Sequence, residues 1–289
     1  MKRWLRTTLG VICLLLLVVT ISFQLIFKIS EHPEMMIQKS GGMTAIKQCF
    51  NSTNAQPLDT DKKLNVLVWN IYKQNRTSWK GALNSFSEES QLLLLQEASL
   101  TESFKQWISI KNWKSHYVSA FTALDVSSGV VNLSSQLPVK ACAFTQAEPW
   151  LRLPKSALYA RYRLSDGQEL VVINIHAINF TLGMTEYTAQ IEALKRAAIT
   201  HSGPMILAGD FNSWSDERTQ TLAEIVAQLR LKEVIFTPDH RKQFVNGLPL
   251  DYVYIRGLEV INAKAPMTDA SDHNPLMVSL RISAPQEPK

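Results

Sequence analysis

Cysteine is scarce in this chain of 289 residues, where it occurs only at Cys13, Cys49 and Cys142. No Cys and His residues follow a zinc-finger spacing, which excludes a structural zinc site of that kind. Because Cys13 lies inside an apolar run, only Cys49 and Cys142 are candidates for pairing. Two ordinary buried thiols are the favoured interpretation. A disulfide is the alternative if this part of the chain lies outside the cytoplasm.

Acidic residues are missing from the first 30 positions, which hold Lys2, Arg3, Arg6 and Lys28. These four cations account for most of the formal net charge of +5 and leave +1 for the rest of the chain. Tight binding of duplex nucleic acid depends on many phosphate contacts from Lys and Arg. Bulk charge therefore gives no support for a nucleic-acid partner.

One long apolar run is present, residues 9–27, with the sequence LGVICLLLLVVTISFQLIF. As a helix, these 19 residues would be about 28 Å long, close to the hydrocarbon thickness of a bilayer. The basic residues before the run place the N-terminus in the cytoplasm. No small-x-small cleavage site follows it. The sequence predicts an uncleaved single-pass anchor, with a cleaved signal peptide and a cytosolic apolar segment as alternatives.

Three segments follow from this pattern: the tip and anchor (1–30), a connector (31–62) and a domain (63–289). The connector has no sustained periodicity, although a short helix near Glu34–Gln48 is possible. In the domain, short apolar runs alternate with helix-like segments, which predicts an α/β domain with mixed sheets. The expected strands are 64–71, 91–96, 129–133, 139–146, 157–164, 170–176, 205–208, 251–255 and 276–282. The expected helices are 78–86, 102–113, 185–200 and 216–229, the last capped by Ser215.

Polar side chains gather where the predicted strands begin or end. Because the ends of neighbouring strands meet at one edge of a sheet, these side chains are expected to converge. Each one alone is most simply a turn residue or a helix cap, and only their order and joint occurrence carry information. The candidates are Asn70, Glu97, His176, Asp210, Asn212, Asp251, Asp272 and His273.

These residues lie in motifs whose order resembles the endonuclease/exonuclease/phosphatase superfamily, which includes DNase I. The chain is most similar to the YafD-like bacterial proteins within it, through WNIYKQ and NIHAINFTLG. The resemblance implies a four-layer α/β/β/α sandwich of the DNase I type, preceded here by one N-terminal transmembrane helix. The motifs are VLVWNI, LLLLQE, SSGVVNLS, VVINIHAIN, ILAGDFNS, LDYVYI and SDHNPLMV.

The resemblance also implies a site for Mg²⁺, with Mn²⁺ as a second possibility. Glu97 would be the main ligand, because its hard oxygen suits such a cation. Asn70 would lie beside it and orient ligands or the phosphate. Asp272 would bind metal or stabilise the loop that carries His273.

The remaining residues receive catalytic roles from the same resemblance. His273 would generate or orient the attacking water, while Asp251 fixes its tautomer and stabilises the imidazolium. Asp210 would align or deprotonate that water. Asn212 would donate hydrogen bonds to a phosphate oxygen, and His176 would act on the leaving-group side as an acid or a stabiliser of negative charge.

The chain departs from the family pattern at three points. Gln136 follows Ser134 and Ser135 where relatives commonly have Ser-Arg. No carboxylate partner for His176 is identifiable, and the catalytic aromatic residue of some relatives has no clear counterpart. His176 itself disfavours an abasic-site repair enzyme, because such enzymes typically lack it.

The sequence therefore predicts a divalent-metal-dependent phosphoesterase that hydrolyses a phosphodiester or phosphomonoester by in-line attack of an activated water. Its substrate is expected to be a nucleic acid, a phospholipid headgroup or another small phosphoester. The expected location is a bacterial inner membrane with the domain in the periplasm, the alternative being cytoplasmic. No protein partner is indicated. A membrane-tethered binding module of the same fold without turnover is the alternative function.

Overall fold

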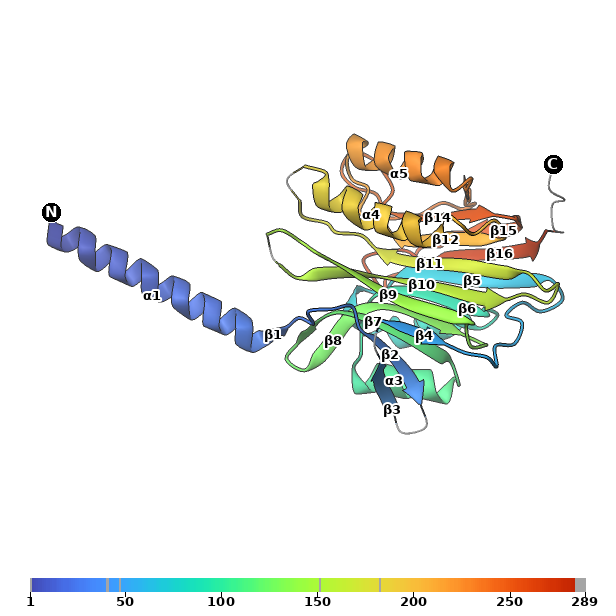
Figure 1. Cartoon of the computed structure of the whole chain (residues 1–289), viewed down its shortest axis with the longest axis horizontal. Coiled ribbons are helices and arrows are strands. Elements are labelled where there is room, and N and C mark those ends of the chain that lie inside the picture. The colour runs from blue at the N-terminus through green and yellow to red at the C-terminus, as the bar shows by residue number, and fades with distance from the viewer. Residues whose placement is uncertain (1, 40–41, 47, 151, 182, 284–289) are drawn as a thin grey trace.

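The structure, a computed structural model, describes residues 2–39, 42–46, 48–150, 152–181 and 183–283. Two β-sheets pack face to face, and helices cover the outer surface of each (Figure 1). A long helix, α1 (Lys2–Ile26), projects away from the sandwich. The predicted four-layer α/β/β/α architecture is confirmed.

The first sheet contains nine strands among the described residues, and β5 and β6 are parallel within it. Its strands are β1 (Phe27–Lys28), β2 (Met35–Lys39), β3 (Gly42–Ile46), β5 (Lys63–Asn70), β6 (Leu92–Ser99), β7 (Lys114–Ala123), β8 (Val126–Ser134), β15 (Leu258–Lys264) and β16 (Leu276–Ile282). Their order is β15-β16-β5-β6-β8-β7-β2-β3, with β1 paired to β7.

The second sheet has the order β13-β14-β12-β11-β10-β9-β4, with β11 and β12 parallel. Its strands are β4 (Cys49–Asn51), β9 (Lys140–Ala147), β10 (Pro154–Arg163), β11 (Glu169–His176), β12 (Met205–Asp210), β13 (Lys232–Glu233) and β14 (Asp251–Arg256). The helices of the domain are η1 (Tyr72–Gln74), α2 (Trp79–Ser87), α3 (Glu102–Ile110), α4 (Thr185–Ala198) and α5 (Asp216–Gln228).

Side-chain alternation along the central strands explains the layers. In β5, Val66 and Val68 point into the core between the sheets, whereas Leu67 and Trp69 pack under α2 and α3. Successive side chains of a strand face opposite sides, so a nearly continuous apolar run supplies two cores at once. The helices α4 and α5 cover the second sheet in the same way. Ser215 caps α5 as predicted, because its side chain accepts a hydrogen bond from the backbone N–H of Arg218.

The predicted short helix near Glu34–Gln48 is wrong, because these residues form β2 and β3 and extend the first sheet. Met35 and Ile37 alternate inward to the core between the sheets, a period-2 pattern that the polar surroundings concealed. Residues 49–51 add β4 to the second sheet. The segment read as a connector thus contributes strands to both sheets, while the domain boundary at residue 63 stays a prediction.

The favoured interpretation of Cys49 and Cys142 as separate thiols is also wrong. The two residues are directly opposite each other on β4 and β9 and form a disulfide. The bond closes a loop across 93 positions, and cross-linking so long a loop restricts the unfolded chain strongly. Sequence reasoning missed the pairing because β4 itself was not recognised.

The N-terminal helix has the properties of a membrane span by length and composition. Residues Arg6–Ile26 have a mean hydropathy of 2.7, and the domain buries none of them. The strand β1 follows α1 without a linker and pairs with β7, Phe27 opposite Ala123. The helix therefore leaves the domain from a fixed point on its surface.

His116 on β7 is a buried imidazole in an apolar setting. Neither ring nitrogen has a hydrogen-bond partner among the described residues, and the ring packs on Phe50 at 4.9 Å. Burial lowers the pKa of His116 from 6.5 to about 3. The folded protein therefore holds this side chain neutral under conditions in which the unfolded chain takes up a proton.

We expect His116→Leu to make stability less sensitive to acid. As pH falls below 6.5, protonation of His116 in the unfolded chain favours unfolding, and this penalty grows until the folded pKa near 3 is reached. The wild type should lose about 1.4 kcal/mol per pH unit relative to the variant between pH 6 and 4. Denaturant unfolding of the full chain in detergent checks this, with the exposed His240→Leu as control. Parallel pH profiles of wild type and His116→Leu would contradict it.

Candidate active site

The polar residues predicted at strand ends meet at one edge of the sandwich. Within the second sheet, His176 at the end of β11 lies opposite Asp210 at the end of β12, and Asp210 lies opposite Asp251 at the start of β14. The first sheet contributes Asn70 from the end of β5 and Glu97 from β6. Face-to-face packing of the sheets brings these two groups together.

Two local backbone features shape this edge. Gly209 has φ +137°, and a Cβ there would lie 2.0 Å from the carbonyl oxygen of Ile175. Only glycine therefore allows β12 to lie so close to β11 beside Asp210. On β6 the register shifts between Leu95 and Ala98, and Glu97 has φ +50°. Such a bulge redirects a side chain, and here the redirected side chain is a site carboxylate.

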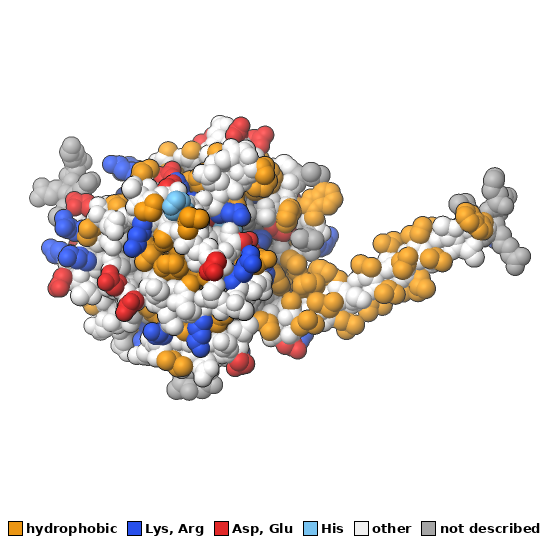
Figure 2. Space-filling model, turned by 180° about the vertical axis from the view of Figure 1, so that it is seen from behind, with side chains coloured by type: hydrophobic (Ala, Val, Ile, Leu, Met, Phe, Trp, Pro, Cys, Tyr) orange, Lys and Arg blue, Asp and Glu red, His pale blue; other side chains and the backbone are white. Residues whose placement is uncertain are grey.

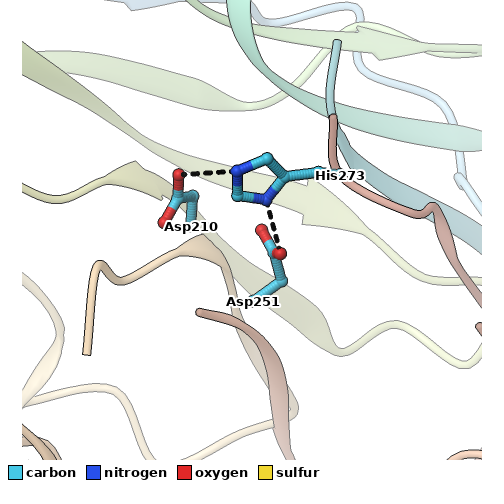
Figure 3. Close-up of side chains that lie close together, drawn as sticks. All are labelled: Asp210, Asp251 and His273. Carbon is cyan, nitrogen blue, oxygen red and sulfur yellow. Dashed lines mark hydrogen bonds and ion pairs between the residues drawn. The ribbon is translucent and has the colours of Figure 1, made fainter. Parts of the chain in front are cut away.

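His273, Asp251 and Asp210 form a buried hydrogen-bonded and ionic chain (Figure 3). The Nδ1 atom of His273 lies 2.7 Å from Oδ2 of Asp251. Its other nitrogen, Nε2, lies 4.0 Å from Oδ2 of Asp210. One carboxylate thus fixes the orientation of the ring, and the free ring nitrogen faces the second carboxylate.

Electrostatics within this chain follow from burial and proximity. Burial alone would lower the pKa of His273, but the charge and hydrogen bond of Asp251, together with Asp210 and Asp272, raise it to about 10. Burial raises the pKa of Asp210 to about 6, an effect that His273 opposes. Ionisable groups with such displaced pKa values are concentrated at functional sites.

Asp210 is held by both of its oxygens. Asn70 Nδ2 donates to Oδ2 at 3.0 Å, and the backbone N–H of Asn212 donates to Oδ1 at 2.9 Å. The side chain of Asn212 uses one of its two amide hydrogens on the carbonyl oxygen of Ala177. Asn70 and Asn212 therefore position the carboxylate that faces His273.

Two lysines that the sequence analysis did not single out complete the site. Lys73 forms an ion pair with Oε2 of Glu97, and Lys155 Nζ lies 3.1 Å from Nε2 of His176. Lys73 belongs to the WNIYKQ motif, which was the available signal. Lys155 lies near the start of β10, and only the pairing of β10 with β11 reveals its position.

His176 lies between these cations and the carboxylates. Its Nε2 is 3.8 Å from Glu97 Oε1 and 3.6 Å from Asp210 Oδ2. Burial first, then Lys155, Lys73 and His273, holds its pKa well below 6.5, so the ring is neutral. Asp272 differs from the other predicted residues: it is exposed, and its Oδ1 lies 3.4 Å from Ser271 Oγ.

Within the described part of the chain, one group of three side chains has the spacing of metal ligands. It consists of Asp210, Asp251 and His273, whose ligand atoms lie within 4.8 Å of one another. This differs from the predicted ligands Glu97, Asn70 and Asp272. Asp251 and His273 are already joined by a hydrogen bond. The carboxylate oxygens of Asp210 and Glu97 are therefore the hard donors that this edge offers to a metal ion.

Arg218 on α5 fixes the loops that carry the site, another residue absent from the sequence prediction. It is buried, and its Nη1 donates to the carbonyl oxygens of Ile178 and Asn212 at 2.9 and 2.8 Å. Its Nη2 donates to Asn179 O and Thr181 Oγ1. One guanidinium therefore ties the segment after β11 to the segment after β12.

We expect Arg218→Met to destabilise the protein by about 3 kcal/mol, because it leaves buried carbonyl oxygens without donors. Arg218→Lys should be intermediate, since an ammonium lacks the planar fork that reaches both loops. Unfolding free energies of the full chain test this, with the exposed Arg230→Met as control, for which a change within about 0.5 kcal/mol is expected. Equal effects of Arg218→Met and Arg230→Met would contradict the role of Arg218 as a clamp.

Comparison with known proteins identifies the family. A family model described as the Endonuclease/Exonuclease/phosphatase family matches residues 67–273. A UPF0294 protein of Vibrio parahaemolyticus is 53% identical over 269 residues, which cover 93% of this chain and 96% of that protein.

Two solved structures have the same fold. The human Nocturnin catalytic domain with bound sulfate matches with a TM-score of 0.59 at 17% identity, over 78% of this chain and 96% of that chain. ANGEL2, a 2′,3′-cyclic phosphatase, matches with a TM-score of 0.61 at 12% identity, over 83% and 99% of the two chains. By the family match and the identity to its relatives, the chain belongs to the endonuclease/exonuclease/phosphatase family.

Proposed function

We propose that the protein is a divalent-metal-dependent phosphoesterase, which hydrolyses a phosphodiester or phosphomonoester by in-line attack of an activated water. The observation that carries the proposal is the buried alignment of Asp251, His273 and Asp210. An imidazole oriented by one carboxylate can place a water, and the second carboxylate, Asp210, can accept the proton of that water. Family membership and the phosphatase among the structural neighbours support the same chemistry.

The geometry suggests where the water would lie. The gap of 4.0 Å between His273 Nε2 and Asp210 Oδ2 admits a water oxygen at about 2.8 Å from each. In the reaction this oxygen forms a bond to phosphorus, its proton passes to the Asp210 carboxylate, and the opposite P–O ester bond breaks, with its electron pair leaving on the ester oxygen. Asn70 and Asn212 keep Asp210 aligned throughout.

The cations of the site would receive the phosphate. Lys155 and Lys73 lie beside His176 and Glu97, so positive charge faces the place where negative charge develops. Because His176 is neutral and close to the Lys155 ammonium, its role fits a stabiliser of charge better than a proton donor. Lys155, which contacts His176, would then be a cation on the leaving-group side.

The donor set also fits a hard divalent cation. Glu97 and Asp210 would hold it by carboxylate oxygens, with Asn70 alongside, as Mg²⁺ and Mn²⁺ prefer. The carboxylate of Glu97 already forms an ion pair with the ammonium of Lys73. When bound, the metal would polarise the phosphoryl oxygen and lower the barrier to attack.

Location in a bacterial inner membrane, with the domain in the periplasm, is part of the proposal. It is supported by α1, which is long and apolar enough to cross a bilayer. A second, independent support is the Cys49–Cys142 disulfide, a bond typical of oxidising compartments.

We expect Glu97→Gln and His273→Ala to separate metal binding from turnover. Glu97→Gln removes a charged ligand and should weaken Mg²⁺ binding by at least about tenfold. His273→Ala should leave Mg²⁺ binding intact and abolish hydrolysis of bis(4-nitrophenyl) phosphate. Calorimetric titration and steady-state kinetics of the full chain in detergent measure both properties. Equal loss of metal binding in the two variants would contradict this division.

The same kinetics test the alternative of a non-catalytic binding module. Hydrolysis that EDTA abolishes and Mg²⁺ restores supports the enzyme. Binding of Mg²⁺ with no turnover across a panel of nucleic acids, phospholipids and soluble phosphodiesters would favour the module.

We expect the full-length protein to fractionate with membranes and its domain to lie outside the cytoplasm. In spheroplasts, added protease should digest the domain, whereas intact cells should protect it. Before reduction, Cys49 and Cys142 should not react with maleimide, because they are joined. Full-length protein in the soluble fraction, or a domain protected in spheroplasts, would overturn this location.

A further inference from the structure

Large apolar side chains are exposed on several separate loops of the domain. The exposed fractions are 76% for Leu124, 64% for Trp150, 58% for Phe180 and 94% for Val245, and Phe244 beside it is 43% exposed. Scattered single apolar residues on a surface need no explanation, but a group on neighbouring loops marks an interaction site. We call these five residues the apolar rim.

The register of the second sheet places two members of the apolar rim at the catalytic edge. Trp150 lies in the turn between β9 and β10, and this turn extends beyond the pair Ala157–Ile175, at the end of β11 where His176 lies. Phe180 follows His176 by four positions. The backbone N–H of Asn179 donates to Glu148 at 2.7 Å, so the two loops are joined beside the site.

The other three members flank the same edge. Leu124 lies at the tip of the hairpin formed by β7 and β8, beyond the pair Ala98–Gly129 that follows Glu97. Phe244 and Val245 lie in the turn that leads into β14 and hence into Asp251. The ring of Phe244 packs on Trp214 at 5.9 Å, which fixes that turn to the loop after Asp210.

The anchor leaves the domain from this edge as well. Ile26, the last residue of α1, accepts a hydrogen bond from the backbone N–H of Leu124 at 3.1 Å. The ring of Phe27 packs between Phe23 and Phe121, at 4.9 and 5.9 Å. Figure 1 shows α1 departing on the side where the β7–β8 and β9–β10 turns lie, and Figure 2 shows hydrophobic side chains on the domain surface beside the foot of α1.

We propose that the apolar rim enters the headgroup layer of the bilayer that α1 spans, so that the catalytic site opens onto the membrane surface. The substrate is then a phosphoester carried by an amphiphile of that bilayer. This inference rests on the proposed phosphoesterase function and on α1 as a membrane span. It names the substrate class that the site would meet.

The composition of the apolar rim favours a lipid surface over a nucleic acid. Single-stranded nucleic acids bind to aromatic side chains together with a basic groove. Leu124 and Val245 have no ring to stack on a base. Trp and Phe beside aliphatic side chains are instead typical of segments inserted at a membrane interface. Because no linker separates α1 from β1, the catalytic edge stays close to the bilayer.

Insertion can be measured directly on the full chain. Nitroxides are attached at Leu124→Cys and Phe180→Cys, in a Cys13→Ser background, after reconstitution into vesicles of phosphatidylethanolamine and phosphatidylglycerol. Ile110→Cys and Ile199→Cys serve as matched controls, because both are exposed apolar residues near the strand ends opposite the site. We expect the rim labels to be accessible to oxygen and shielded from a water-soluble nickel complex. Equal nickel accessibility at rim and control positions would overturn the proposal.

Activity provides the second test and separates the two proposals. The double variant Trp150→Asp/Phe180→Asp should cleave phospholipid in these vesicles at least about tenfold more slowly than wild type, because charge opposes insertion. Its hydrolysis of bis(4-nitrophenyl) phosphate should stay within about twofold, and Ile110→Asp should be unchanged on both substrates.

The activity test distinguishes failure of the rim proposal from failure of the phosphoesterase proposal. Wild-type hydrolysis of the soluble diester without hydrolysis of vesicle lipid, or equal lipid hydrolysis by the rim variant, would overturn the rim proposal and leave the phosphoesterase intact. Absence of metal-dependent hydrolysis of the soluble diester would overturn the phosphoesterase itself. In that case the nitroxide measurement still decides whether the rim meets the bilayer.

Discussion

The contact between His273 and Asp251 joins the two halves of the sandwich, and the site depends on it. His273 lies in the loop before β16 of the first sheet, whereas Asp251 begins β14 of the second. Neither sheet alone contains both partners of this contact. Two hydrogen bonds fix this loop. Trp69 Nε1 donates to the carbonyl oxygen of His273 at 2.9 Å, and the hydroxyl of Ser271 donates to the carbonyl oxygen of Asn70. The alignment of the site therefore depends on the packing of the two sheets against each other.

The charged side chains at this contact are buried, and the pKa values of His273 and Asp210 are displaced. Asp210, Asp251 and His273 are nearly inaccessible to water, and buried charges are tolerated only when paired and hydrogen-bonded. Their mutual attraction raises the pKa of His273, and desolvation raises that of Asp210. Lys73 and Lys155 add positive charge beside Glu97 and His176.

Sequence periodicity was sufficient for the central strands and for the α-helices α2, α3, α4 and α5, because a long apolar or amphipathic run between turn residues is compatible with few other structures. It failed for β1, β2, β3, β4, β7, β13 and β15, which are short or polar-rich strands, several of them paired with strands distant in the sequence. The expectation that polar side chains at strand ends converge placed four residues correctly at one edge: Asn70, His176, Asp210 and Asp251. It could not find Lys155 or Arg218, which reach the site only through strand pairing and helix docking, and the role of Asp272 stays a prediction.

The most direct measurement is steady-state hydrolysis of bis(4-nitrophenyl) phosphate by the full chain and by Asp251→Asn, at saturating Mg²⁺. The amide keeps the size of the side chain but no longer stabilises a protonated His273. The account predicts a kcat at least about 100-fold lower, with KM and the Mg²⁺ dependence unchanged. A variant with the turnover of the wild type would contradict the central role of the His273–Asp251 contact.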